Sequence, residues 1–210
     1  MRIELWFDFV CPYCYLGERK LELALEKFEH RDEVELIFKS FELNMASDST
    51  KGKDINQIIA DKYHVSYAQA KANNDSITEA GRQVGLNIRF DLFQVERTKL
   101  AHELVHYAAG QGKNLELIRR LFEGVFTQGL HLEDREVLFQ LTKDLGVDLT
   151  HFQSQYENGT LSSQVQRDEE EAAKLGINSI PHFIIDGKYV ISGAQSPDYI
   201  LNALNKAYHK

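Results

Sequence analysis

The sequence predicts a mixed α/β protein, α+β overall, with strands near both ends of the chain and an all-helical segment between them. Three observations predict this arrangement. Runs of β-forming apolar residues lie near the two ends, leucines at helical spacing fill the middle, and no proline occurs from residue 13 to residue 180. Neither end holds enough strands for a complete layer, so we expect both ends to contribute to one sheet.

The N-terminal end predicts a strand, a helix and a second strand. Residues 2–9 are apolar at both alternating positions, which is typical of a strand covered on both faces. Pro12 fits the first turn of a helix, where a missing N–H costs no hydrogen bond, and residues 34–38 predict the next strand. Short links between these elements favour a right-handed parallel βαβ unit.

The middle of the chain predicts several helices. Two candidate capping boxes, Ser66 with Gln69 and Thr150 with Gln153, mark helix starts. The acidic run 168–171 is expected on a solvated helix face. Helices are expected to stop at Gly85, Gly112, Gly129, Gly146, Gly159 and Gly176.

The C-terminal end predicts a hairpin and a last helix. Asp186-Gly187 separates two apolar runs, and a type I′ turn needs residues that accept a positive φ at both central positions. Ser196 and Pro197 fit the N-cap and the first turn of a helix that continues through Tyr208.

The order of elements predicts two domains. Residues 1–45 and 160–210 are expected to form one discontinuous domain that contains the sheet. Residues 46–159 are expected to form an inserted helical domain, whose length is ordinary for a domain.

Composition excludes several classes of partner. The chain has 210 residues, a net charge of −8 and no basic cluster, so no nucleic-acid partner is predicted. No apolar run approaches the roughly 18 residues of a membrane span, and the first residues lack a secretory apolar segment. We therefore expect a cytoplasmic protein without a membrane partner. The sequence leaves the oligomeric state open.

The two cysteines, Cys11 and Cys14, are separated by two residues. In a reducing compartment, such a pair is typical of a redox centre or of half a metal site. Cys11 follows the first predicted strand and precedes Pro12, so its sulfur is expected at a helix N-terminus, where N–H groups favour a thiolate. Cys14 lies one turn inside and should be less exposed. We therefore predict that Cys11 is the nucleophile and Cys14 the resolving thiol, with Tyr13 exposed beside them.

A metal site is the alternative for this pair. Zinc takes about four nitrogen or sulfur ligands. Among the eight histidines, His102 and His106 have paired-ligand spacing, and a polar helix face explains that spacing equally well. We predict no metal. The reversible Cys11–Cys14 disulfide needs no other cofactor, and glutathione is a candidate co-substrate.

Several motifs together resemble a known family. They are Phe7-Asp8-Phe9-Val10-Cys11-Pro12-Tyr13-Cys14-Tyr15-Leu16-Gly17, Phe41-Glu42-Leu43-Asn44, Ala101-His102, Gly176-Ile177, Ile180-Pro181-His182-Phe183 and Gly193-Ala194-Gln195. With these motifs, nearly the whole chain resembles the DsbA-like branch of the thioredoxin superfamily, specifically the FrnE-type DsbA family oxidoreductases. The resemblance implies a thioredoxin-like domain with a helical insertion. It also implies a cis Ile180-Pro181 bond that faces the cysteines.

The resemblance further implies the activity. Such proteins reduce, form or isomerise disulfides in protein or small thiol substrates. The chain departs from the family at three positions: Tyr13 where tryptophan is frequent, Met45 where proline is frequent and Arg97 where asparagine is frequent. The Arg97 difference is expected to change the substrate cleft and to leave the redox pair intact.

Three further residues are candidate members of the cleft. Asp8 precedes Cys11 by three residues and would either relay a proton or bond local backbone groups. His102 would either form a wall of the cleft or pack within its helix. His182 would either point toward the cysteines or away from them, because strand side chains alternate.

Two other functions stay open. Kappa-type glutathione transferases and hydroxychromene-carboxylate isomerases share the helical insertion but generally lack the second cysteine, so Cys14 favours redox chemistry. A chaperone-like binding module would use a groove of the helical segment, and the two cysteines would then be vestigial.

Overall fold

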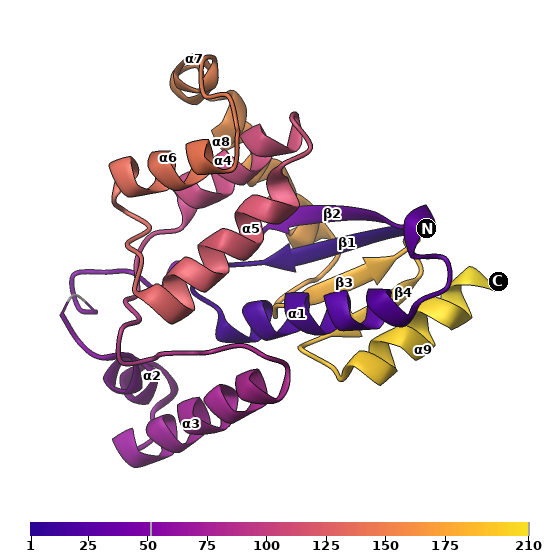
Figure 1. The fold of residues 1–210 in the computed structure, drawn as a ribbon. Coiled ribbons are helices and arrows are strands. Elements are labelled where there is room, and N and C mark those ends of the chain that lie inside the picture. Colours follow the sequence, from indigo (N-terminus) through magenta and orange to yellow (C-terminus); the bar gives the residue numbers. More distant parts are fainter. Residues whose placement is uncertain (51, 210) are drawn as a thin grey trace. The chain divides into compact units, whose positions relative to one another are not determined.

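The computed structural model describes residues 1–50 and 52–209. Its backbone groups into two compact units (Figure 1). The sheet unit consists of Met1–Glu42 and Arg167–Lys210, and the helical unit consists of Leu43–Gln166. The mixed α/β fold predicted from the sequence is confirmed. The predicted domain boundaries stay a prediction.

The sheet unit takes its elements from both ends of the chain. They are β1 (Arg2–Phe7), α1 (Pro12–Lys27), the short 3-10 helix η1 (Arg31–Glu33), β2 (Glu35–Ser40), the end of α8 (Thr160–Lys174), β3 (His182–Ile185), β4 (Tyr189–Ser192) and α9 (Pro197–Tyr208). The strand order is β2-β1-β3-β4. β1 runs parallel to β2 and antiparallel to β3, and β4 is antiparallel to β3. The expectation that both ends share one sheet is therefore confirmed.

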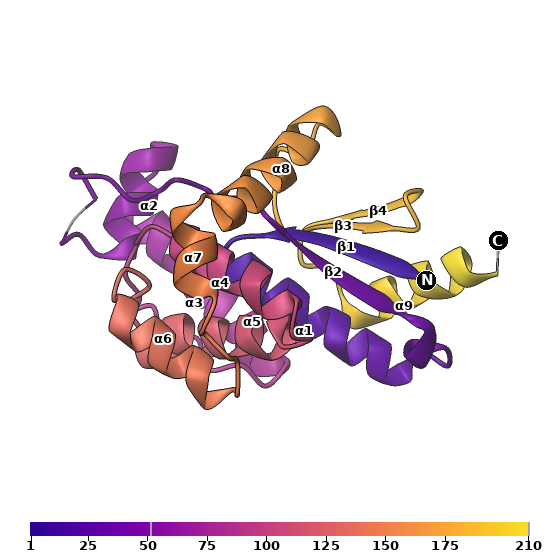
Figure 2. The ribbon, with the colours of Figure 1, turned by 90° about the horizontal axis from the view of Figure 1, so that it is seen from above.

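Both faces of this sheet are covered, as the apolar pattern of the first strand predicted. Leu5 pairs with Phe183, and Phe183 reaches Gly17 of α1, so α1 covers this face. On the opposite face, the fully buried Trp6 packs with Ala172 of α8. Figure 2 shows α1 and α9 on one side of the strands and the C-terminal end of α8 on the other.

Local signals near the C-terminus are confirmed. Asp186 and Gly187 have φ values of 47° and 66°, the positive values that a type I′ turn requires. The Ser196 hydroxyl accepts a hydrogen bond of 3.2 Å from the Tyr199 amide and caps α9.

The helical unit contains α2 (Ile55–Tyr63), α3 (Tyr67–Gln83), α4 (Lys99–Ala109), α5 (Asn114–Glu123), the π-helical turn η2 (Gly124–Gln128), α6 (Arg135–Asp144), α7 (Phe152–Glu157) and the start of α8. Residues 84–98 join α3 to α4 without a helix or strand. Within the described part of the chain, no helix has both the length and the apolar composition of a membrane span.

One predicted capping box is confirmed and the other is wrong. Ser66 and Gln69 form a reciprocal box at the start of α3. Thr150 does not cap α7, which begins at Phe152. Its hydroxyl and its amide both donate to an Asp148 carboxylate oxygen, at 2.5 and 2.9 Å. The Asp148 carboxylate therefore takes the hydrogen bonds of Thr150, which forms a local turn instead of a helix cap.

The acidic run of α8 does not lie wholly on a solvated face: Glu170 is exposed, as predicted, whereas the prediction is wrong for Asp168. Asp168 is 5% exposed. One of its carboxylate oxygens accepts a hydrogen bond of 2.9 Å from the Ser40 amide, and the other lies 3.1 Å from Nζ of Lys39. Glu171 also accepts a hydrogen bond from Lys39, at 2.9 Å. These partners lie in β2, more than a hundred residues away, so the charge pattern of the helix could not reveal them.

The same contacts keep Lys39 charged. Burial alone would lower the pKa of Lys39, but the hydrogen bond to Glu171 and the charge of Asp168 outweigh burial and raise it. The pair therefore joins β2 to α8 as ions, within the sheet unit.

We predict that Asp168→Ala lowers the free energy of unfolding by about 3 kcal/mol, because it leaves the half-buried Lys39 and the Ser40 amide without this carboxylate. The control is Asp75→Ala, which removes an exposed ion pair with Lys71 and should cost about 0.5 kcal/mol or less. Urea unfolding followed by circular dichroism measures both. Equal losses would contradict a structural role for the buried pair.

Candidate thiol site

Cys11 lies where β1 ends and α1 begins. It is the N-cap residue of α1, in an extended conformation, and Pro12 occupies the first turn. The amides of Cys14 and Tyr15 donate to the Cys11 carbonyl, at 3.0 and 3.4 Å, and start the helix. The Cys11 sulfur therefore lies at the positive end of the helix dipole, where an anion is stabilised.

Cys14 lies one turn inside α1 and is fully buried, whereas Cys11 is 7% exposed. Burial raises the pKa of Cys14 well above its usual value, and a hydrogen bond to Cys11 and the charge of Cys11 raise it further. The backbone N–H of Asp8 acts in the opposite direction, and the Asp8 carboxylate raises the pKa slightly. Cys14 is therefore a protonated thiol at neutral pH.

The peptide bond between Ile180 and Pro181 is cis, as the resemblance implied. The Cys11 sulfur lies 3.9 Å from the Ile180 carbonyl oxygen, within the range of a thiol hydrogen bond. The Pro181 carbonyl accepts a hydrogen bond of 2.8 Å from the Gly193 amide, which ties this loop to the end of β4. The loop before β3 thus lies against the first thiol.

Gly17 lets α1 approach this loop. A Cβ atom at Gly17 would lie 2.8 Å from Cγ of Pro181 and 3.3 Å from Cζ of Phe183. Lys20, one turn later, donates a hydrogen bond of 2.8 Å to the Ala194 carbonyl. Sequence reasoning assigned no role to Gly17 or Lys20, although Gly17 and Ala194 belong to the motifs that carry the family resemblance.

The structure also places three other predicted site residues of the sheet unit. Asp8 is fully buried beside them, and its carbonyl accepts a hydrogen bond of 3.2 Å from the Cys11 amide. Tyr13 is exposed, as predicted. His182 shares a sheet face with Trp6, with ring centroids 6.4 Å apart, and thus lies on the face opposite Phe183 and α1. Burial lowers the pKa of His182.

His102 belongs to the helical unit. It lies in α4 and is fully buried, and its role in a cleft stays a prediction. Among the described residues, no three histidine, cysteine or acidic side chains gather as metal ligands would.

Comparison with known proteins decides the family. The model of the DSBA-like thioredoxin domain matches residues 2–205. The chain belongs to this family. DsbA-like proteins act on thiol or disulfide substrates, in keeping with the two thiols at the start of α1. The finer FrnE-type assignment stays a prediction.

Relatives support the assignment over the full length. The chain is similar to a probable DsbA oxidoreductase from Streptomyces coelicolor, with 32% identity and a TM-score of 0.90, over 100% of this chain and 91% of that one. It is 28% identical to the Bacillus subtilis protein YwbO, over 100% of this chain and 98% of YwbO. The cytosolic disulfide reductase DsbM from Pseudomonas aeruginosa shares the fold, with 16% identity and a TM-score of 0.70, over 100% of this chain and 99% of DsbM.

We predict that Gly17→Ala destabilises this DsbA-like protein by about 2 kcal/mol. The overpacking against Pro181 should outweigh the roughly 1 kcal/mol by which alanine favours a helix. Gly110→Ala is the matched control, because its φ is −62° and its Cβ would meet its nearest neighbour at 3.6 Å. The control should be neutral or slightly stabilising in urea unfolding. Equal stability of the two variants would contradict a close approach at Gly17.

We also predict that the two thiols differ in reactivity. In Cys11→Ser, burial still raises the pKa of Cys14, so alkylation by iodoacetamide should be slow at pH 7 and rise only at strongly alkaline pH. In Cys14→Ser, Cys11 should react at least about ten times faster at pH 7, because it lies at the helix N-terminus. Both variants should react equally in urea. Faster alkylation of native Cys11→Ser at pH 7 would reverse the assignment.

Proposed function

We propose that this chain is a disulfide reductase that uses Cys11 and Cys14 on protein or small-molecule disulfides. The observation that carries the proposal is the placement of Cys11 at the start of α1, against the Ile180 carbonyl, with the buried Cys14 thiol hydrogen-bonded behind it. This arrangement supports two successive thiol–disulfide exchange steps, the second of which closes a small ring through a Cys11–Cys14 disulfide.

In the first step, the Cys11 thiolate attacks one sulfur of the substrate disulfide. A mixed disulfide forms at Cys11, and the other substrate sulfur leaves as a thiolate. In the second step, Cys14 loses its proton and attacks the Cys11 sulfur, which releases the second substrate thiol. The substrate gains two electrons, and the Cys11–Cys14 pair becomes a disulfide. The substrate thiolate that left in the first step takes up the proton that Cys14 loses, so the step balances.

Two molecules of a low-molecular-weight thiol would return the pair to the reduced form, by the same exchange in reverse order. We propose glutathione for this step. One solved structure of DsbM contains glutathione, and that protein has the same fold at 14% identity and a TM-score of 0.64. DsbM is described as a cytosolic reductase, which agrees with the cytoplasmic location expected here. That location stays a prediction.

The presence of Cys14 disfavours a kappa-type transferase. A transferase that only activates glutathione needs one group at the helix N-terminus and has no use for a second thiol one turn inside.

We predict that Cys11→Ser loses at least about 99% of the insulin reductase activity measured with glutathione as reductant, since the attacking sulfur is absent. Cys14→Ser should still attack but should accumulate a mixed disulfide with glutathione when oxidised glutathione is added. Intact-mass measurement before and after dithiothreitol detects this adduct.

The matched control is Tyr13→Phe, which keeps both sulfurs and should keep both steps. Adducts on Cys11→Ser instead of Cys14→Ser would reverse the two roles. Full activity in both cysteine variants would exclude the pair as the reactive centre and favour a binding module.

A further inference from the structure

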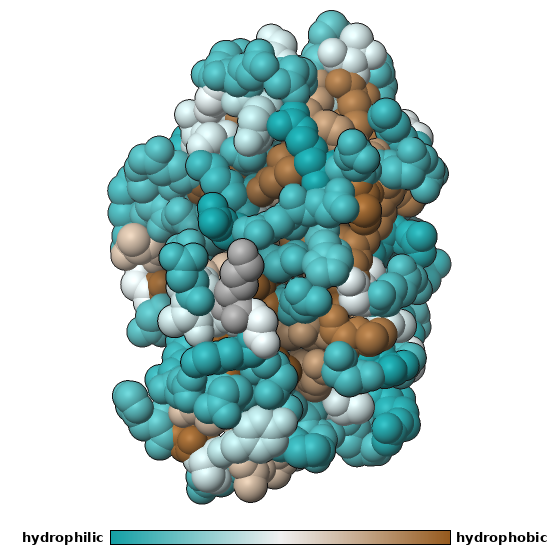
Figure 3. All heavy atoms as spheres, turned by 90° about the vertical axis from the view of Figure 1, so that its left-hand side faces the viewer, coloured by the Kyte–Doolittle hydropathy of each residue, from teal (hydrophilic) through white to brown (hydrophobic). Residues whose placement is uncertain are grey.

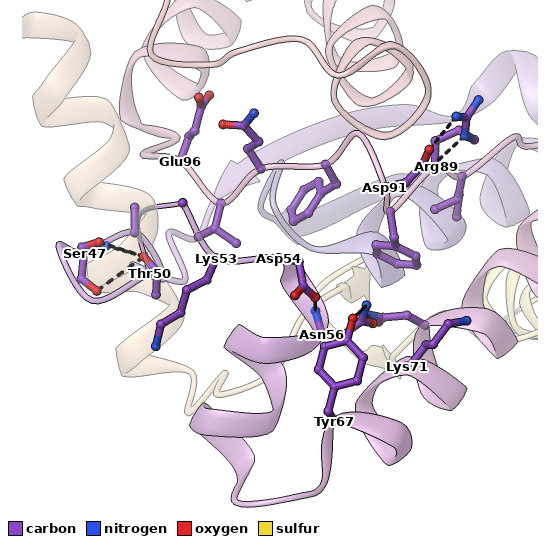
Figure 4. Close-up of a pocket in the computed structure, with 18 of the residues that line it drawn as sticks. Ser47, Thr50, Lys53, Asp54, Asn56, Tyr67, Lys71, Arg89, Asp91 and Glu96 are labelled. Atoms are coloured by element: carbon purple, nitrogen blue, oxygen red, sulfur yellow. Dashed lines mark hydrogen bonds and ion pairs between the residues drawn. The ribbon is translucent and has the colours of Figure 1, made fainter.

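A cavity of about 920 Å³ lies within the helical unit. Figure 4 shows Asn56 and Tyr67 on the α2–α3 side of the cavity, and Arg89, Asp91 and Glu96 on the segment that passes above it. The lining residues lie between Ala46 and Glu133, so none is part of the thiol site described above. The cavity is therefore separate from the thiol site.

One wall of this cavity is formed by residues 93–96, which belong to no helix or strand. On either side of it, the Leu92 amide donates to the Arg89 carbonyl at 3.1 Å, and the Arg97 amide donates to Glu133 at 3.4 Å. Between these two bonds, the amides and carbonyls of residues 93–96 have no hydrogen-bond partner among residues 1–50 and 52–209. A segment with unpaired backbone donors and acceptors can pair with the main chain of another strand.

The facing wall carries neutral polar groups. Asn74 donates a hydrogen bond of 2.9 Å to the Asn56 side chain, and Asn56 donates one of 3.4 Å to the Tyr67 hydroxyl. Side-chain amides both donate and accept, so they can bond the main chain of a peptide of any sequence. Tyr67 is 45% exposed and offers an aromatic surface as well.

Charge restricts the ligand. The basic residues of the lining all have acidic partners inside the helical unit: Lys53 with Asp61, Lys71 with Asp75, Arg89 with Asp91 and Arg97 with Glu133. The lining also contains more acidic than basic side chains, and Asp48, Asp54 and Glu96 add to the acidic set. An anion would meet repulsion here, whereas a neutral or basic chain would not.

We propose that this cavity binds an extended, neutral or basic polypeptide segment. The segment adds as a strand along residues 93–96 and lays its side chains against Tyr67 and the Asn56 amide, which the buried Asn74 holds in place. Four residues of strand cover about 13 Å, so a short stretch of unfolded chain is sufficient. Figure 3 shows one side of the protein, which is mainly hydrophilic with apolar patches between. This binding is independent of the exchange steps, since no cysteine takes part.

The test uses the full chain with Cys11→Ser and Cys14→Ser, so that no covalent adduct forms. The probe is a fluorescein-labelled, cysteine-free peptide of alternating threonine and valine with two lysines. Fluorescence anisotropy should give saturable binding to this parent. A copy with two glutamates in place of the lysines should bind at least about five-fold more weakly, and a copy N-methylated at alternate residues should bind at least about ten-fold more weakly.

Two pairs of variants locate the site on the parent. Gln94→Pro removes one unpaired backbone amide and should weaken binding about five-fold relative to Gln94→Ala, which keeps that amide. Tyr67→Ala should weaken binding at least about three-fold, while Tyr199→Ala, which removes a similarly exposed tyrosine from α9, should stay within about two-fold of the parent. If Gln94→Pro does not fold, the tyrosine pair decides.

Four results would overturn the proposal: no saturable binding by the parent, equal binding of the N-methylated copy, equal effects of Tyr67→Ala and Tyr199→Ala, or displacement of the peptide by glutathione. Displacement would assign the cavity to a small thiol instead. The protein used in this test has no cysteine, so a negative binding result says nothing against the proposed reductase activity. Conversely, if the unmodified chain has no reductase activity, the binding result still stands.

Discussion

The antiparallel pairing of β1 with β3 joins the two ends of the chain, with Leu5 opposite Phe183 and Trp6 opposite His182. α1 follows β1, and the Ile180–Pro181 loop precedes β3, so this pairing places the loop against the start of the helix. Gly17 completes the approach, because a larger residue would meet Pro181. Cys11 and Ile180, 169 residues apart in sequence, come within 3.9 Å as a result.

The same sheet unit tolerates a large insertion because the two places where the chain leaves and returns are held together. β2 ends at Ser40, shortly before the chain enters the helical unit, and α8 brings it back. The amides of Ser40 and Glu42 donate to the carboxylates of Asp168 and Glu169, at 2.9 and 3.2 Å. These bonds, with the Lys39–Asp168 ion pair, let the sheet form with the long segment in between.

The chemistry and the proposed peptide site use the backbone in opposite ways. At the thiol site, backbone hydrogen bonds from Cys11 to Asp8 and from Cys14 and Tyr15 to Cys11 fix the turn from β1 into α1, and the reactive groups are the side chains of Cys11 and Cys14. In the helical unit, residues 93–96 leave donors and acceptors unpaired, so the backbone itself is the recognition surface. In a reductase that acts on unfolded substrates, the thiol site would exchange the disulfide and the proposed peptide site would hold the substrate chain.

The sequence by itself determined the features that depend on neighbours a few residues apart. Pro12 after Cys11, the Ser66–Gln69 box, the Asp186-Gly187 turn and the Ser196 cap were readable because their hydrogen bonds and φ requirements are local. The order of strands and helices also followed from hydrophobic spacing, and the cis bond from the family motif.

Only the tertiary structure decided features that depend on distant partners. Asp168 is buried because Lys39 and Ser40 lie beneath it, and His182 faces Trp6 because of the register between β1 and β3. The open backbone at residues 93–96 gives no sequence signal at all, since unpaired amides are a property of what surrounds a segment. Burial and pairing across more than a hundred residues are set by packing, and no local pattern encodes them.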